Sequence, residues 1–373
     1  MIKIGDITEI RGQIQRGWIK LVEHPTGVDE KLSVIIASGT SDGPTLLITA
    51  NVHGHETVGI VIIHRILEQL NLKLLRGRVV CIPSLNPTGL LRGTRHPQFD
   101  DVDPNRMWPS SKPKTELVSD ATDYLDEINQ RMDLPKPQER AWSRIFTQIS
   151  EINPDFHIDL HTCSTLSIPY AFLDRVLYQT NKEEADNLFE RTKAMVRASG
   201  LTIIADASAS RYVKYNLYRS TSGSSLNKRR IPATTFELGP KFDVDPYCRD
   251  AAIKAINNIM KWAHMIDGNL EVITNVPVIQ GKEIYRELNY PFSPCTGIVD
   301  YYMNPGDFFK INDLLAVVRQ IDGTILEEIR SEVEGFVIAW WPGIAKYQGE
   351  PLGIVAVPDK LPFVVSWSDV NAK

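Results

Sequence analysis

Two histidines and a glutamate stand at the ends of two apolar segments. His53 and Glu56 follow the run 45–50, and His161 closes a second run that begins at residue 156. A strand that ends in His-x-x-Glu presents an imidazole and a carboxylate from one tight turn, so both can reach one ion. Two His and one Glu leave a coordination position free for water, which is the composition of a catalytic zinc site. We therefore expect one Zn²⁺ per chain, although a lone His-x-x-Glu also occurs by chance.

Two further segments carry polar chemistry. Arg92, Arg95, Asn105 and Arg106 fall within 15 residues of an irregular, Gly- and Pro-containing stretch. Together they indicate an anion-binding surface, because a guanidinium fork grips a carboxylate with two hydrogen bonds. For Arg92 we favour a solvated position. Glu237 ends another apolar strand, and a glutamate placed there beside a metal ion can accept a proton from an attacking water.

The order of these motifs resembles that of the zinc carboxypeptidase superfamily. The matching segments are His53-x-x-Glu56, Asn86-Pro-x-Gly, Arg95, Asp103-x-Asn105-Arg106, Asp159-Leu-His161 and Glu237-Leu-Gly-Pro. The Glu-Leu-Gly-Pro form and a β-rich C-terminal segment are most similar to the succinylglutamate desuccinylase/aspartoacylase family. By motif order the resemblance covers residues 30–268. Six motifs in sequence are hard to produce by chance, although no single one is specific.

The resemblance implies a metal site and a catalytic acid–base group. It makes His53, Glu56 and His161 the zinc ligands, and Glu237 the general base and acid. His55 stands where the family usually has Asn or another small polar residue, and we expect its side chain to point away from the ion.

The resemblance also implies how a substrate is held. Arg95 would polarise the scissile carbonyl, with Arg92 as the alternative because a long insert follows Arg95. Asn105 and Arg106 would bind the substrate carboxylate.

Composition agrees with a globular enzyme. The chain has 373 residues, which favours two domains, and a net charge of −5 without a sustained basic run. This gives no support for binding nucleic acid or an acidic membrane. The N-terminus does not resemble a signal peptide, and no apolar run is long enough to span a bilayer. Four scattered cysteines predict reduced thiols and a cytoplasmic location.

The fold class follows from the alternation of apolar strands and amphipathic helices up to residue 268. This pattern predicts an α/β catalytic domain, 1–268, with a mixed, mostly parallel sheet covered by helices on both faces. Ligands of such sheets bind at the carboxyl ends of the strands, which is where His53, His161 and Glu237 fall. We interpret residues 109–139 as an excursion or a lid, with a short helix near 120–132.

Residues 269–373 predict a second, all-β domain. The segment 297–318 is repeated approximately at 335–355, which resembles the pseudo-symmetric barrel of biotinyl and lipoyl domains. The predicted hairpin 320–324 contains no lysine, so the resemblance implies the fold without an attached cofactor. Lys310 and Lys346 are expected to be solvated. The predicted roles are capping of the active site, narrowing of its mouth or contact within a homo-oligomer.

These expectations predict a zinc-dependent amidohydrolase that acts on the carbon–nitrogen bond of a small N-acyl amino acid or similar linear amide. One alternative is a zinc carboxypeptidase, although a narrowed mouth excludes long peptides. A barrel amidohydrolase using His53 and His55 is a second, but it requires about eight strand–helix units. The third is a non-catalytic protein that keeps the pocket.

Overall fold

The computed structural model describes residues 2–98, 101–108, 137–279, 281 and 283–371. The expected excursion at 109–139 lies outside the described residues except for its last three, which begin helix α4 (Pro137–Ile152). The expected short helix near 120–132 lies wholly outside them.

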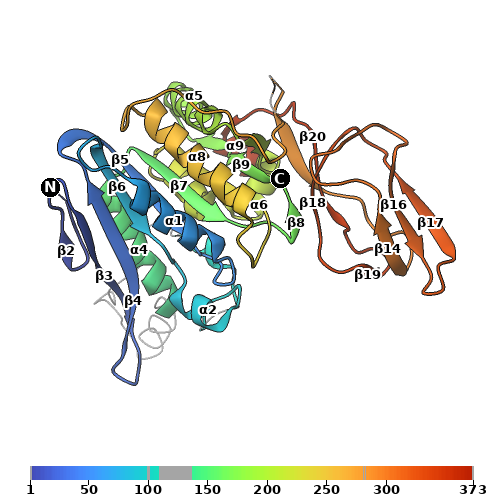
Figure 1. The fold of residues 1–373 in the computed structure, drawn as a ribbon, viewed down its shortest axis with the longest axis horizontal. Helices are drawn as coiled ribbons and strands as arrows, with labels where there is room; N and C mark the ends of the chain where they lie inside the picture. The colour runs from blue at the N-terminus through green and yellow to red at the C-terminus, as the bar shows by residue number, and fades with distance from the viewer. Residues whose placement is uncertain (1, 99–100, 109–136, 280, 282, 372–373) are drawn as a thin grey trace, which may run out of the picture.

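One large mixed sheet organises the chain (Figure 1). Its strands are β3 (Ile14–Glu23), β4 (Asp29–Ser38), β5 (Ser41–Ala50), β6 (Arg76–Ile82), β7 (Phe156–His161), β8 (Leu166–Ser167), β9 (Pro169–Leu173), β11 (Thr202–Ala205), β12 (Ala233–Leu238), β13 (Tyr285–Asn289), β15 (Phe308–Phe309), β18 (Gly335–Trp340) and β20 (Gly353–Pro358). They lie in the order β15-β18-β20-β13-β11-β9-β12-β7-β5-β6-β4-β3, and β8 pairs with β18.

Parallel pairing is confined to the middle of this sheet. Strands β6, β5, β7 and β12 pair in parallel, as do β9, β11 and β13, whereas β9 and β12 are antiparallel. The pairs at both flanks are antiparallel. The sheet is therefore mixed, and β5, β7 and β12 bring their carboxyl ends to one edge.

Helices cover both faces of the sheet (Figure 1). Helices α1 (Val58–Gln69), α5 (Lys182–Ser199) and α8 (Pro246–Trp262) pack on one face, and α4 and α7 (Thr221–Asn227) lie on the other. In β7 the apolar residues Phe156, Ile158 and Leu160 enter the core under α1 and α8. Because side chains alternate along a strand, His157, Asp159 and His161 face the α4 and α7 side.

The remaining elements are short. They are β1 (Lys3–Ile4), β2 (Ile7–Thr8), β10 (Val176–Tyr178), β21 (Val364–Ser366), α2 (Pro87–Arg92), α6 (Ala209–Lys214), α9 (Trp367–Asn371) and the 3₁₀ turns η1 (Pro104–Arg106) and η2 (Leu217–Arg219). The sequence analysis did not predict α2 or the edge strand β3. Helix α2 has Asn86 as N-cap and Gly93 as C-cap, and its six residues are too short to show a helical period.

Among the described residues after Gly268, the regular elements are β-strands except for α9. Strands β14 (Gly297–Tyr301), β16 (Leu314–Arg319), β17 (Ile325–Arg330) and β19 (Ala345–Lys346) form a second sheet, and an apolar core lies between it and β18 and β20. The large sheet runs across the predicted boundary, because β13 pairs with β11. The division into domains 1–268 and 269–373 therefore remains a prediction.

The sequence repeat corresponds to two antiparallel strand pairs, β14 with β16 and β18 with β20. The turn between β16 and β17 closes through the hydrogen bond from Gln320 N to Thr324 O at 2.8 Å. Lys310 is exposed, as expected. The expectation for Lys346 is wrong: this residue is buried, and its Nζ donates to the carbonyl of Pro342 at 3.0 Å, which satisfies the ammonium inside the fold.

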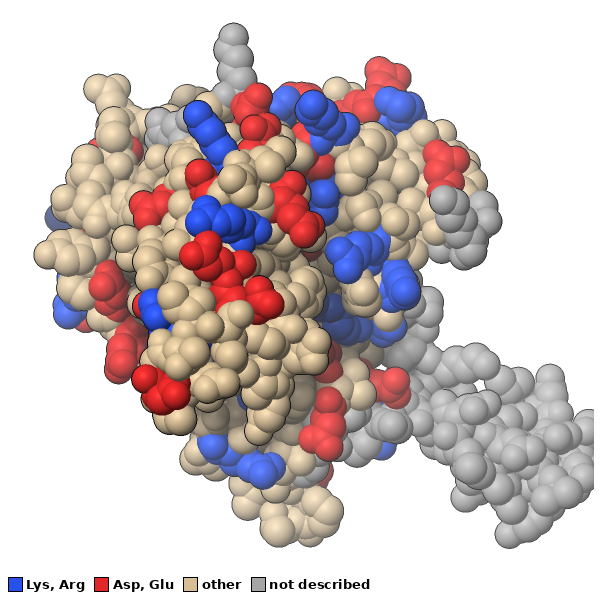
Figure 2. All heavy atoms as spheres, turned by 90° about the vertical axis from the view of Figure 1, so that its right-hand side faces the viewer, with Lys and Arg blue, Asp and Glu red and all other residues tan. Residues whose placement is uncertain are grey.

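The surface of the C-terminal strands carries both charge signs. Lysines and arginines are interspersed with aspartates and glutamates on this face (Figure 2), with Arg330 and Glu328 paired at 2.8 Å on β17. Among the described residues, none of the helices has the length and apolar character that crossing a membrane requires.

Candidate active site

The turn after β5 is built around Asn51. This residue has a φ of 57°, a left-handed conformation that asparagine tolerates. Its Nδ2 donates to the carbonyls of His53, Gly54 and Glu56 at 3.1, 2.9 and 3.0 Å. A Cβ at Gly54 would lie 2.0 Å from the backbone of Gly89, so only glycine lets the turn approach α2 this closely. The turn is thereby fixed before any ligand binds.

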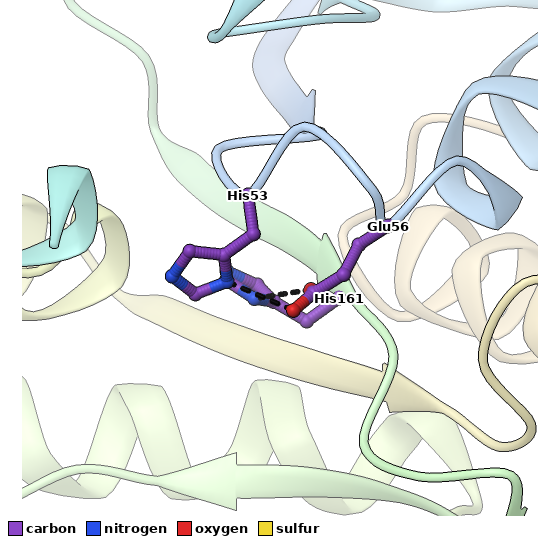
Figure 3. A group of neighbouring side chains, drawn as sticks. All are labelled: His53, Glu56 and His161. Carbon is purple, nitrogen blue, oxygen red and sulfur yellow. Dashed lines mark hydrogen bonds and ion pairs between the residues drawn. The ribbon is translucent and has the colours of Figure 1, made fainter. Parts of the chain in front are cut away.

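His53, Glu56 and His161 converge at this edge of the sheet (Figure 3). The Nδ1 of His53 lies 2.9 Å from Oε1 of Glu56, and the Nδ1 of His161 lies 3.0 Å from Oε2. All three side chains are buried, and one ligand atom from each lies within 4.8 Å of the other two. The Nε2 of His55 is farther away, at 3.8 Å from Glu56, and its ring packs near Phe242.

Each imidazole of this group is held through its second nitrogen by a carboxylate. The Nε2 of His161 lies 2.8 Å from Oδ2 of Asp159, and the Nε2 of His53 lies 3.0 Å from Oδ1 of Asp103. A carboxylate at the far nitrogen keeps a proton there, which leaves Nδ1 free to bind a metal. Both rings are thus oriented for the same task.

A buried hydrogen-bond chain extends behind His161. Thr49 Oγ1 donates to Oδ1 of Asp159 at 2.6 Å and therefore accepts from Nε2 of His157 at 2.8 Å. The Nδ1 of His157 then accepts from Ser225 Oγ at 2.7 Å. Burial lowers the pKa of His157 to about 4, so its ring is neutral and suits these roles. The chain fixes Asp159 from the side opposite His161.

Charge interactions within the group are strong. Burial alone would raise the pKa of Glu56, but the adjacent imidazoles of His53 and His161 hold it well below its usual value. Burial alone would lower the pKa of His161, but the carboxylates of Asp159 and Glu56 raise it well above its usual value. The two carboxylates thus favour a positive charge on the His161 ring, a charge that a metal ion bound at this position would supply instead.

Glu237 faces the same side of the sheet as His161. The two residues are direct partners in the parallel pair of β12 and β7. Oε2 of Glu237 is buried and has no hydrogen-bond partner among the described residues. Burial raises the pKa of this carboxyl to about 7, within the range useful to a general base and acid at neutral pH.

A cavity of about 500 Å³ adjoins these residues. Arg95 lines it, donates through Nη2 to Asp103 at 2.8 Å and lies 3.6 Å from Glu56. The alternative residue, Arg92, is exposed at the end of α2 and does not line the cavity. The position of Arg95 therefore suits contact with a ligand, and that of Arg92 does not.

Asn105 and Arg106 form another wall of the cavity. Oδ1 of Asn105 accepts hydrogen bonds from the backbone nitrogen and the hydroxyl of Thr221, at 2.8 and 2.9 Å. In the described part of the chain its Nδ2 donates none. The guanidinium of Arg106 donates to the Asn105 carbonyl at 2.8 Å, and its other N–H groups make no hydrogen bond to the residues that the structure describes. Both residues thus present donors to the cavity.

Residues 42–263 match the succinylglutamate desuccinylase/aspartoacylase catalytic domain, which is more than half of the chain. The chain belongs to the succinylglutamate desuccinylase/aspartoacylase family. This confirms the resemblance drawn from the order of the motifs. Membership makes the chain a relative of enzymes that remove acyl groups from amides.

A curated relative of the chain is the N-alpha-acetyl-L-2,4-diaminobutyric acid deacetylase of Halomonas elongata. It is 27% identical over 355 residues, which covers 92% of this chain and 91% of the relative. The solved structures of a succinylglutamate desuccinylase/aspartoacylase from Rhodobacter sphaeroides and of the product-bound ectoine utilization protein EutE (DoeB) from Ruegeria pomeroyi each give a TM-score of 0.69. At 20% and 18% identity, with 95% of this chain and 99% and 98% of those chains covered, they share its fold.

The family implies zinc, and the side chains fit that ion. Two imidazole Nδ1 atoms and a carboxylate form a donor set typical of catalytic zinc. The carboxylates of Asp103 and Asp159 complete the outer contacts that such ligands usually have. The chemistry of the donors therefore agrees with what the family implies.

Several residues around the site were not identified from the sequence. Asp103 was recognised as part of a motif, but its bond to His53 depends on the path of the loop before η1. Asp174, Asp206 and Glu287 also line the cavity. Asp174 and Asp206 directly follow β9 and β11, but these strands run antiparallel to β12, so the strand-end rule would not have placed them beside His161. Glu287 lies within β13, where the strand-end rule gives no signal.

Proposed function

We propose that the protein is a zinc-dependent deacylase in which His53, Glu56 and His161 hold the ion. The observation that carries this proposal is the convergence of both Nδ1 atoms on the two oxygens of Glu56, at 2.9 and 3.0 Å, beside a cavity. A bound Zn²⁺ supplies Lewis acidity, which polarises the acyl carbonyl and acidifies a water molecule.

Glu237 moves the proton in this proposal. Its unpartnered Oε2 accepts a proton from the water that attacks the acyl carbon. The same oxygen then donates that proton to the nitrogen of the leaving amine as the carbon–nitrogen bond breaks. A carboxyl pKa of about 7 makes both transfers accessible at neutral pH.

Arginine side chains orient the substrate. Arg95 donates to the acyl oxygen as negative charge develops there, a contribution that is usually large when the donor is positioned in advance. Asn105 Nδ2 and the Arg106 guanidinium bind the substrate carboxylate, which sets the distance between the acyl group and Glu237. The bond from Arg95 to Asp103 limits the movement of the guanidinium.

The proposed substrate is a small N-acyl amino acid. The relative from Halomonas elongata is named for the deacetylation of such a compound, and a cavity of about 500 Å³ suits a molecule of that size. Glu287, Asn289, Trp341 and Ile354, from the C-terminal region, line the cavity and favour this reading over a carboxypeptidase. The barrel amidohydrolase is wrong for this fold, because the sheet is open and mixed.

The proposed reaction is tested by acetate release from N-acetyl amino acids. We expect hydrolysis by zinc-loaded protein, loss after chelation and recovery when Zn²⁺ is restored. Glu56→Gln should abolish both metal retention and hydrolysis, whereas the control Glu68→Gln, at an exposed position of α1, should behave as wild type. Full hydrolysis by the metal-free protein would refute the proposal. A protein that binds N-acetyl amino acids and zinc without turnover would instead be the non-catalytic alternative.

For the C-terminal region we propose a barrel of the biotinyl and lipoyl type without an attached cofactor. The two equivalent antiparallel strand pairs and the shared apolar core support this reading. Intact mass spectrometry of protein from its native host should show the unmodified chain, and a mass increase on a lysine would contradict the proposal.

For the compartment we propose the cytoplasm. Cys81, Cys163, Cys248 and Cys295 are free thiols, as is usual in a reducing environment. Fractionation of the native host tests this directly.

A further inference from the structure

The cavity contains three carboxylates that the proposed reaction does not use. Asp174 and Asp206 follow β9 and β11, and Glu287 comes from β13 in the C-terminal region. They line the same cavity as His161 and Glu237. A substrate held at the metal site is therefore exposed to them.

These carboxylates keep hydrogen-bonding capacity for a ligand. Asp174 is 3% exposed and accepts one hydrogen bond at Oδ2, from Ser222 Oγ at 3.0 Å. Asp206 accepts at Oδ1 from the backbone nitrogen of Ala207 at 2.6 Å. Within the described residues, Glu287 accepts no hydrogen bond. Ionised carboxylates in such surroundings normally have more partners than this.

Carboxyl groups outnumber the cationic side chains that line the cavity, and burial favours their protonated forms. Burial, together with the nearby Asp206 carboxylate, raises the pKa of Asp174 to about 8. Burial likewise raises the pKa of Glu287 to about 8, with contributions from Asp206 and Glu237. Arg106 favours the ionised form of all three carboxyl groups, Arg175 also acts on the two aspartates and Arg211 on Glu287. All three pKa values nevertheless stay above their usual values, so the cations do not offset the cost of burial.

Arg175, which acts on the two aspartates, is already engaged within the protein. Arg175 is fully buried and forms an ion pair with Asp359 at 2.6 Å. It also donates to the backbone carbonyls of Ala207, Leu361 and Pro362. Its charge is therefore largely used within the protein, and an uncompensated acidic region remains.

A second observation shows that the cavity is shaped for a polar ligand. The side chain of Thr162 is 3% exposed and lines the cavity, yet its Oγ1 has no hydrogen-bond partner among the described residues. The Oε2 of Glu237 is unpartnered in the same way. Buried polar atoms are nearly always satisfied, so these two point to polar groups of a bound molecule.

A bound substrate carboxylate changes the balance of charge in the cavity. When it binds Arg106, it neutralises the cation that acts on all three of Asp174, Asp206 and Glu287. A second positive charge on the substrate then compensates the three carboxylates. A neutral side chain would leave them ionised and unpaired, or force them to stay protonated, at a cost in binding free energy.

We propose that the cavity selects N-acyl amino acids whose side chain ends in a protonated amine, with Asp174, Asp206 and Glu287 receiving the ammonium group. The proposal rests on the deacylase function proposed above and defines its substrate class. An ammonium has three donors, and three carboxylates from three strands can accept them.

The test compares three probes that differ at one group. N-α-acetyl-2,4-diaminobutyrate ends in an ammonium, N-acetylnorvaline replaces it with a methyl group of similar size, and N-acetylglutamate carries a carboxylate. We expect kcat/KM for the diaminobutyrate compound to exceed that for norvaline by about 10- to 100-fold, the range for a charged hydrogen bond. The glutamate compound should be the poorest substrate, because its charge repels the three carboxylates.

Variants identify the residues responsible. Glu287→Gln should lower kcat/KM for the diaminobutyrate probe about tenfold and leave norvaline within about twofold. Asp206→Asn should also lower kcat/KM for the diaminobutyrate probe. This second variant keeps the proposal testable if Glu287→Gln folds poorly. The control is Glu327→Gln, an exposed carboxylate of β17 that should leave all three rates unchanged. Equal losses on every probe would show that Glu287 has only a structural role and would overturn the proposal.

Failure of the reaction and failure of the selectivity give different results. If norvaline or glutamate probes are hydrolysed as fast as the diaminobutyrate probe, the deacylase stands and the proposed selectivity is wrong. If no probe is hydrolysed, the deacylase is wrong, and calorimetric binding to Glu237→Gln decides the selectivity. Preference for the diaminobutyrate probe by tenfold or more would support it, and equal or absent binding would contradict it.

Discussion

At the scale of single residues, both histidines of the site already have one ring nitrogen bonded to a carboxylate. The outer nitrogens of His53 and His161 bond to Asp103 and Asp159, so only the inner nitrogens face Glu56. Glu237 is the exception, since its Oε2 has no partner among the described residues. A histidine bonded through one nitrogen can bind an ion through the other, and a carboxyl oxygen without a partner can accept a proton.

Glu237→Gln should separate metal binding from turnover. Glutamine has nearly the same size but cannot accept the proton, so zinc should be retained while kcat falls by about 10²- to 10⁴-fold. Metal content and acetate release on the same sample check this. A variant that keeps near-wild-type kcat would remove Glu237 from the mechanism.

The acidic residues predict a dependence of stability on pH in the absence of ligand. The pKa of Glu287 is raised to about 8 from 4.5, so the folded state favours the protonated form. Its contribution to stability is fully present below about pH 4.5 and is lost as the pH rises through about 8. Replacement by Gln, which never ionises, should therefore leave Tm unchanged at pH 4.5 and raise it by about 1–3 °C at pH 9.

Thermal denaturation of wild type and Glu287→Gln at both pH values gives this difference. The exposed control Glu327→Gln should follow the wild type throughout. A Glu287→Gln variant that is less stable than wild type at pH 9 would contradict the assignment of uncompensated charge.

At the scale of elements, the site depends on which face of each strand its residues occupy. Thr49 on β5 is the direct partner of Asp159 on β7, and Glu237 on β12 is the direct partner of His161. Parallel pairing without a shift places all four on the face covered by α4 and α7. A change of one residue in register would move the site to the opposite face.

Thr49→Val should weaken zinc binding although Thr49 does not touch the ion. Valine matches the shape of threonine but cannot donate to Asp159 or accept from His157, so the carboxylate that orients His161 loses a support. Mutations of residues that support a metal ligand through hydrogen bonds typically lower metal affinity 10- to 100-fold, and we expect about tenfold here. Competition with a chromophoric chelator measures it.

The matched control for this experiment is Thr40→Val, whose hydroxyl is exposed. It should keep wild-type zinc affinity. If Thr49→Val folds normally and binds zinc as tightly as the wild type, the buried chain does not position the ligand.

Part of this arrangement of site residues could be predicted from the sequence. His53, His161 and Glu237 end strands that their apolar runs made evident, and the carboxyl ends of those strands meet at one edge. The chain from Ser225 to His161 was not predictable, because it depends on helix α7 and on the pairing of β5 with β7. Such contacts require the tertiary structure.

The acidic region of the cavity could not be predicted from the sequence for the same reason. Asp174, Asp206 and Glu287 come from strands separated by more than 30 residues in sequence, and only the order β13-β11-β9 brings them to one cavity. The burial of Lys346 likewise follows from the packing of β19 and not from its local sequence. Local patterns therefore located the strand-end ligands but not the groups that surround them.

At the scale of the whole molecule, the cavity joins the two parts of the chain. β13 extends the large sheet beside β11, and the C-terminal region contributes Glu287, Trp341 and Ile354 to the cavity wall. The proposed metal ligands and Glu237 come from the first 268 residues. In the proposed function, the first part of the chain therefore supplies the catalytic groups and the C-terminal region limits access to them.

Trp341→Ala should widen the cavity and relax its selectivity. We expect the ratio of kcat/KM for an N-acetyl dipeptide to that for an N-acetyl amino acid to rise about tenfold, since pocket size discriminates by this order. The control is Trp18→Ala, a tryptophan of β3 that is 52% exposed and does not line the cavity. An unchanged ratio in Trp341→Ala would show that this residue does not limit access.

The central claim is that one zinc ion lies between His53, Glu56 and His161. Anomalous diffraction from crystals of the zinc-loaded protein, recorded on both sides of the zinc absorption edge, tests it most directly. We predict one peak per chain at about 2.0–2.2 Å from Nδ1 of each histidine and from the Glu56 carboxylate, with His55 turned away. A peak coordinated by His55 instead of His53, or no peak at this position in zinc-loaded crystals, would contradict the account.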